Sequence, residues 1–114
     1  MTVKLNRTAF EHARELIRRG RTVKDERDDW SEHIPSTDDE NAWVDQHGWE
    51  QYALWHLGVD DDEPEGTKKR YSFPFGDYAR VHRCAVVSLE SRAGQHDHPD
   101  IGNAAHRLLQ DLDR

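Results

Sequence analysis

The chain has 114 residues with a formal net charge of −7 at pH 7, and hydrophobic and charged residues each make up 34% of it. This length suits one domain, and the negative charge disfavours binding along a nucleic-acid backbone. There is no apolar run long enough to cross a membrane, no signal-peptide pattern and only one cysteine, which excludes an internal disulfide. We therefore expect a single cytoplasmic domain over residues 1–114.

The amount of apolar side chain suggests a small hydrophobic core. Leu, Ile, Val and Phe together make up less than a fifth of the chain, a composition close to that of disordered proteins. Four Trp and three Tyr residues argue against disorder, because disordered segments are poor in aromatic residues. We expect a small folded core with long charged loops.

The first helix is expected over residues 8–19. Thr8 and Glu11 have the spacing of a capping box, and Gly20 suits the left-handed position after the last turn. Val23 fits a short extended piece. The charged run from Lys24 to Asp29 is expected to be a solvated loop.

The middle of the chain predicts two further helices, or one bent helix. A capping box within residues 36–40 begins a helix that runs to His47, and residues 49–57 form another that Gly58 ends. The segment 59–69 is acidic and then basic, and we expect it to be a loop. Its spacing does not fit an EF-hand calcium loop.

The stretch 71–95 is expected to be central to the fold. Residues 71–75 include three aromatic residues and are predicted to lie extended against the helices. Asp77 is expected to cap a buried helix over residues 78–95. The apolar periodicity of residues 99–113 predicts a last helix, which we expect to pack antiparallel to the helix over residues 78–95. The predicted fold is therefore all-α, a small bundle of four to five helices with long charged loops.

The same region resembles a known protein segment. The run FP…GD…VHRCA…RAGQ…DIGNAA…LL, within residues 71–112, is similar to a short helical segment of unknown function in actinobacterial and phage proteins. In phage proteins that segment is often attached to head-maturation protease or structural polypeptides. His82 stands one place after the family's histidine position, which Val81 occupies here. The resemblance implies a bacterial or phage origin and no particular activity.

Basic residues on both sides of the aromatic segment predict a partner-binding surface. Within an acidic protein, such a local basic surface favours docking of another protein with an acidic surface. The alternative is internal pairing with the acids of residues 60–65 and with Asp77. The predicted partner-binding residues are Lys69, Arg70, Tyr71, Arg80 and Arg83.

Histidine and aspartate near the last helix offer a second kind of site. Imidazole and carboxylate groups are ligands for zinc or nickel when they converge. The candidate ligands are His96, His98, Asp100 and His106. The alternative is that these residues form a polar turn between two helices.

Cys84 is predicted to be structural. It lies in an apolar part of the expected helix, where burial should raise the pKa of its thiol. His82 is two residues away and is expected to lie on a different face of the helix. Neither a nucleophile motif nor a glycine-rich phosphate loop is present.

We therefore expect a non-enzymatic interaction or structural module of bacterial or phage origin, without a cofactor. One alternative is a histidine-based metal-binding protein. The other is a nucleic-acid binder that uses the basic face of the central helix.

Overall fold

The structure is a computed structural model that describes residues 3–26 and 29–114. The predicted all-α fold is wrong, because this part of the chain forms a mixed α/β domain in which five α-helices accompany two small sheets. The elements in chain order are β1 (Val3–Leu5), α1 (Arg7–Arg18), β2 (Thr22–Val23), α2 (Trp30–His33), α3 (Thr37–Ala53), β3 (His56–Asp60), the 3-10 turn η1 (Lys68–Arg70), β4 (Tyr71–Pro74), β5 (Val81–His82), α4 (Arg83–Gln95) and α5 (Pro99–Leu112).

The two sheets join segments that are far apart in the sequence. The larger sheet is antiparallel in the order β1-β3-β4, and Leu5 lies opposite Gly58 while Gly58 lies opposite Ser72. The smaller sheet is the parallel pair β2 and β5, in which Val23 lies opposite His82. Both pairings bring a strand from the first quarter of the chain to its second half.

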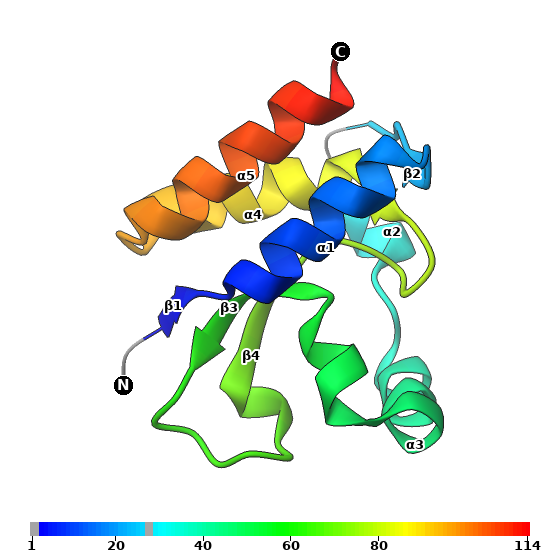
Figure 1. The fold of residues 1–114 in the computed structure, drawn as a ribbon, viewed down its shortest axis with the longest axis vertical. Helices are drawn as coiled ribbons and strands as arrows, with labels where there is room; N and C mark the ends of the chain where they lie inside the picture. Colours follow the sequence, from blue (N-terminus) through cyan, green and yellow to red (C-terminus); the bar gives the residue numbers. More distant parts are fainter. Residues whose placement is uncertain (1–2, 27–28) are drawn as a thin grey trace.

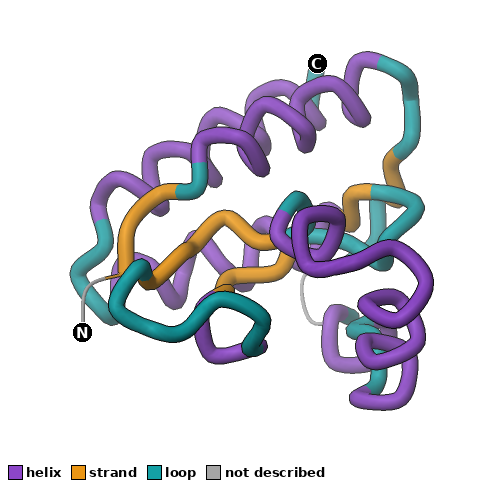
Figure 2. Tube along the Cα trace, turned by 60° about the horizontal axis from the view of Figure 1, so that its bottom comes forward, coloured by secondary structure: helices purple, strands orange, loops and turns teal. Residues whose placement is uncertain are grey.

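Helices α1, α4 and α5 gather on one side of the larger sheet (Figure 1). Helices α4 and α5 lie side by side and are joined by a short turn, so the predicted antiparallel pair is confirmed. Helix α3 lies away from α5 in both views (Figures 1 and 2). Among the described residues, no helix is both long enough and apolar enough to cross a bilayer.

Strand β3 replaces the end of a predicted helix. Helix α3 ends at Ala53, and the backbone is extended from His56. Gly58 is a strand residue rather than a helix stop: a Cβ atom added there would lie 2.5 Å from Ser72 Oγ and 2.8 Å from the Phe73 ring. Glycine is therefore needed because β4 packs closely against this position.

The central helix begins five residues later than predicted. The Asp77 carboxylate accepts hydrogen bonds from the N–H groups of Ala79 and Arg80, as expected, but these bonds close a turn. Tyr78 has a φ of 69°, which is outside the right-handed helical region. Val81 and His82 then pair with β2, and α4 begins at Arg83.

The other helix boundaries follow local signals more closely. Asn6 caps α1 by accepting a hydrogen bond from the N–H of Ala9, so the predicted Thr8 cap is wrong. Ser36 and Asp39 form the predicted capping box of α3. The backbone of Gly48 is not helical (φ 84°, ψ 170°), so α3 consists of two helical segments that meet at Gly48, where the sequence predicts the first of them to end.

Residues 71–74 of the aromatic segment form strand β4, and the side chains of Phe73 and Phe75 are buried, as predicted. Phe75 is fully enclosed, and its ring stacks on Trp55 with 5.5 Å between ring centroids. Phe73 is also buried, and the Arg92 guanidinium lies over its ring. These rings join the sheet to the helical layer.

Replacing Phe75 with alanine tests this role. We expect Phe75→Ala to lower the free energy of unfolding by about 3–5 kcal/mol, because the enclosed ring leaves a cavity. Phe10→Ala is the matched control and should cost less, since Phe10 is only partly buried. Urea unfolding followed by circular dichroism measures both changes, and equal costs would contradict a core position for Phe75.

Candidate metal centre

His82 lies between two carboxylate groups. Its Nδ1 is 2.8 Å from Asp25 Oδ2, and its Nε2 is 2.8 Å from Asp77 Oδ2. Carboxylates only accept hydrogen bonds, so each contact is a hydrogen bond when the ring nitrogen that faces it carries a proton. The imidazole is therefore oriented from both sides.

Strands β2 and β5 and the turn at Asp77 bring the two carboxylates to His82. Because Val23 lies opposite His82 in the parallel pair, Asp25 follows β2 at the right distance to reach the imidazole. Asp77 is held from the other side by the turn that its own carboxylate closes with Ala79 and Arg80.

Asp25 also caps α4 from 59 positions away in the sequence. Its Oδ1 accepts a 2.8 Å hydrogen bond from the Cys84 N–H, and the Cys84 thiol bonds the same carboxylate. His82 is the N-cap residue but makes no side-chain capping bond. The carboxylate of Asp25 therefore satisfies a free N–H of the first turn and suits the positive end of the helix.

Burial and hydrogen bonding together set the charges at this cluster. The side chains of His82 and Asp25 are only 5% and 7% exposed. Burial raises the pKa of Asp25, but hydrogen bonds from Cys84 and His82 outweigh it and hold this pKa at about 2. Burial and the neighbouring Asp25 raise the pKa of Cys84 to about 12, as its predicted structural position required.

These three residues form a set of metal-ligand atoms. One carboxylate oxygen of Asp25, one ring nitrogen of His82 and the Cys84 sulfur all lie within 4.8 Å of one another. Among residues 3–26 and 29–114, no other group of three or more His, Cys, Asp or Glu side chains comes together in this way. A buried thiol with a raised pKa does not fit a nucleophile, whereas oxygen, nitrogen and sulfur at this spacing fit a transition metal.

The predicted histidine ligands occupy other environments. The His98 ring lies in a T-shaped arrangement with the Phe73 ring, and His106 Nδ1 is 3.3 Å from Glu90 Oε2. Asp100 accepts hydrogen bonds from two backbone N–H groups, and His96 is the C-cap of α4. In the described chain, the structure does not bring these four residues together.

The predicted basic surface is divided between internal pairs and exposed side chains. Arg70 bonds the carboxylate of Asp61 and the Glu63 carbonyl, and Arg83 pairs with Asp113 at 2.9 Å. Two members, Lys69 and Arg80, are exposed, and Tyr71 is partly buried. Partner binding through these residues stays a prediction.

The cluster could not be recognised from the sequence. Asp25 belongs to the charged run 24–29, which was expected to be a solvated loop and of which Arg27 and Asp28 lie outside the described residues. His82 and Cys84 were expected on different faces of one helix, whereas His82 is in β5 and Cys84 is in the first turn of α4. The missing information is the pairing of β2 with β5, because only that pairing brings Asp25 to the other two residues.

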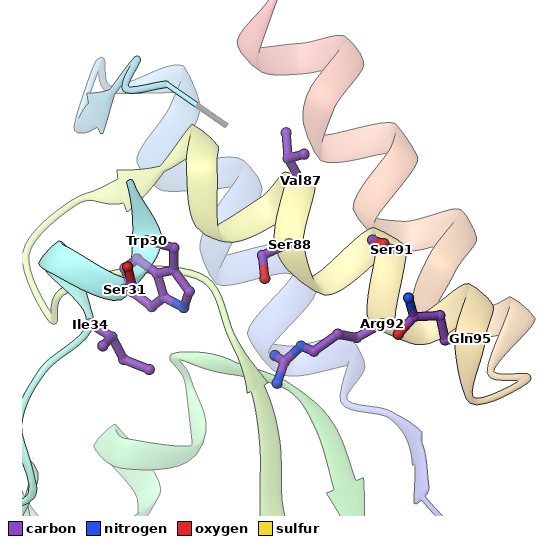
Figure 3. A pocket seen from close by; sticks show the side chains of 8 residues that line it. All are labelled: Trp30, Ser31, Ile34, Val87, Ser88, Ser91, Arg92 and Gln95. Carbon is purple, nitrogen blue, oxygen red and sulfur yellow. The ribbon is translucent and has the colours of Figure 1, made fainter. Parts of the chain in front are cut away.

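A groove lies next to this cluster, between α2 and α4 (Figure 3). Trp30 of α2 and Ile34, the residue directly after α2, form one wall, and the Arg92 side chain extends from α4 along the opposite side. Ile34 is 45% exposed and is the only large hydrophobic residue exposed in the described chain. The remaining lining residues are Ser31, Val87, Ser88, Ser91 and Gln95.

Comparison with other proteins adds no family to this description. A scan against family models and searches of curated proteins and solved structures find no significant match to the chain. The resemblance of residues 71–112 stays a prediction.

The low pKa of Asp25 predicts a loss of stability in acid. A carboxyl group whose pKa is lowered by folding stabilises the folded state above its unfolded pKa, and this contribution is lost as the group is protonated. We expect part of the free energy of unfolding to disappear between about pH 4 and pH 2. Asp25→Asn should be less stable at neutral pH and should show a smaller change over this interval.

The exposed ion pair of Asp113 with Arg83 provides the control. Asp113→Asn should leave the acid dependence close to that of the original protein, because exposed pairs contribute little. Urea unfolding at several pH values measures all three proteins. An unchanged acid dependence in Asp25→Asn would contradict the assigned role of Asp25.

Proposed function

We propose that the protein binds one transition-metal ion, with Zn²⁺ as the best-fitting ion, through Asp25, His82 and Cys84. The observation that supports this proposal is the convergence of three different ligand atoms within 4.8 Å in a buried position. Zinc accepts oxygen, nitrogen and sulfur ligands together and imposes no strong geometric preference of its own. This proposal moves the metal site away from the histidines near the last helix.

The separations between the atoms suit a metal ion after a small adjustment. Zinc bond lengths of about 2.0–2.3 Å place tetrahedral ligand atoms about 3.3–3.8 Å apart. The three ligand atoms lie within 4.8 Å, and His82 Nδ1 and Asp25 Oδ2 are now at hydrogen-bond distance, 2.8 Å. The metal would replace the protons that His82 Nδ1 and the Cys84 thiol share with Asp25, and these protons would be released.

The contact of His82 with Asp77 supports a ligand role for the imidazole. Metal-binding histidines commonly donate their other ring N–H to a carboxylate, which fixes the ring and raises its basicity. The 2.8 Å contact of His82 Nε2 with Asp77 Oδ2 has this arrangement, and it leaves Nδ1 facing Asp25. Asp77 therefore acts as a positioning residue for the ligand.

The site would join three segments of the fold. Asp25 follows β2, His82 belongs to β5 and Cys84 lies in the first turn of α4, so one ion would cross-link them. A metal that binds only the folded state stabilises it. A reduced thiol at the centre is compatible with the cytoplasmic location and the bacterial or phage origin that we expect from the sequence.

Zinc titration of the metal-free protein tests the proposal. We expect one equivalent of Zn²⁺ to bind with micromolar or tighter affinity in calorimetry. A free ion concentration of 100 times the dissociation constant should stabilise the fold by about 2.7 kcal/mol. Cys84→Ser and His82→Gln should each weaken binding at least about 100-fold, with circular dichroism used to verify that the variants fold.

Two histidines outside the site provide controls. His98→Gln and His106→Gln should leave zinc affinity unchanged, because neither residue belongs to the group of ligand atoms formed by Asp25, His82 and Cys84. No binding by the original protein would overturn the proposal. Loss of binding in His98→Gln with full binding in His82→Gln would also do so.

A second candidate function is a protein-interaction module that uses the groove between α2 and α4. Arg92 is partly desolvated, which lowers its pKa, and its guanidinium lies over the Phe73 ring. Among residues 3–26 and 29–114, none of the ion pairs includes Arg92. An acidic segment of a partner protein would supply the missing charge, and Ile34 would receive an apolar side chain next to it. This candidate retains the expected acidic partner but uses a different surface.

Titration with a capped peptide of alternating leucine and aspartate tests the groove. We expect amide resonances of Ser88 and Ser91 to shift on binding, and Arg92→Gln should remove the effect. Arg107→Gln is the control, because Arg107 pairs with Asp111 on α5 and does not line the groove. Equal shifts in both variants would exclude a role for Arg92.

A further inference from the structure

His33 lies beside the proposed metal centre without bonding to it. Its Nε2 is 3.9 Å from Asp25 Oδ2, and its ring centroid is 5.2 Å from that of His82. The side chain is 41% exposed, so it has room to change its rotamer. His33 is the last residue of α2, a helix of four residues.

The three buried residues leave one position of a tetrahedral zinc site to be filled. Structural zinc sites almost always have four protein ligands, whereas sites with three keep a place for water or substrate. Asp77 Oδ2 is occupied by His82 Nε2, and the Trp30 indole next to His82 can only donate. His33 is therefore the neighbouring side chain with a nitrogen lone pair to offer.

Helix α2 would be held by such a bond. Its only large buried side chain is Trp30, which packs against Cys84 and Ala85 in a small cluster of its own. The helix supplies Trp30 to the wall of the groove, and Ile34 directly after the helix completes this wall (Figure 3). A bond from His33 to the metal would connect this wall directly to Asp25, His82 and Cys84.

Resting on the proposed metal centre, we infer that His33 is the fourth ligand and that metal occupancy controls the order of α2, one wall of the groove. With zinc bound, the imidazole of His33 moves from 3.9 Å above Asp25 Oδ2 into coordination. Without zinc, α2 is held by Trp30 and its backbone bonds. The metal is thus a regulator of the groove as well as a cross-link of β2, β5 and α4.

Nitrogen-15 spectra of the histidine side chains test the ligand assignment directly. We expect one ring nitrogen of His82 and one of His33 to shift into the metal-bound range when Zn²⁺ is added. His33→Gln should still bind Zn²⁺ through the other three ligands, with an affinity at least about tenfold lower. His96→Gln is the matched control and should keep the affinity of the original protein, because His96 lies at the far end of α4.

The outcomes separate this inference from the proposed function. If the resonances of His82 shift and those of His33 do not, the metal centre stands and the fourth-ligand inference is overturned. If neither histidine shifts, the proposed metal centre itself fails.

Hydrogen exchange tests the effect on α2. The Ile34 N–H donates to the Trp30 carbonyl at 2.8 Å and so reports the opening of this helix. Zinc should slow its exchange at least about tenfold in the original protein and should have a much smaller effect in His33→Gln. Equal slowing in both proteins would show that His33 does not connect the metal to α2.

Discussion

The hydrogen-bonded contact between Asp25 and His82 is the interaction on which the second half of the fold depends. Asp25 follows β2, His82 ends β5, and the other oxygen of Asp25 caps the first turn of α4 through Cys84. Removing one partner from a buried pair of this kind leaves an unpaired charge and typically costs about 3–5 kcal/mol. The carboxylate therefore fixes where β5 ends and where the central helix begins.

The remaining stability comes from a separate apolar core. Buried side chains of α1, α4 and α5 pack on the larger sheet, with Phe75 and Leu57 fully enclosed among them. Strand β4 can pack closely against β3 because Gly58 has no side chain. The cluster of Asp25, His82 and Cys84 shares Cys84 with a second, smaller apolar group that also contains Trp30 and Ala85.

The chemistry of the proposed metal centre follows from the surroundings of Cys84 and His82. The Cys84 thiol, with a pKa of about 12, is protonated at neutral pH and is inert as a nucleophile until a metal displaces its proton. Asp77 orients His82 from the opposite side, as outer carboxylates do in metal sites. Helix α2, which has only four residues, borders both the proposed metal centre and the groove. The two candidate functions therefore involve the same helix.

Local sequence signals determined the elements that depend on neighbouring residues. They include the Ser36–Asp39 capping box, the amphipathic last helix, the turn that Asp77 closes and the burial of Phe73 and Phe75. The helix predicted over residues 49–57 is correct only as far as Ala53, and the helix predicted over residues 78–82 does not form. Strands β3 and β5 lie there instead, because distant partners satisfy their backbone hydrogen bonds. Asp25 looked like one acid in a charged loop for the same reason. Only the tertiary structure decided that it meets His82 and Cys84, since the parallel pairing of β2 with β5 joins segments separated by more than fifty residues and leaves no periodic trace in the sequence.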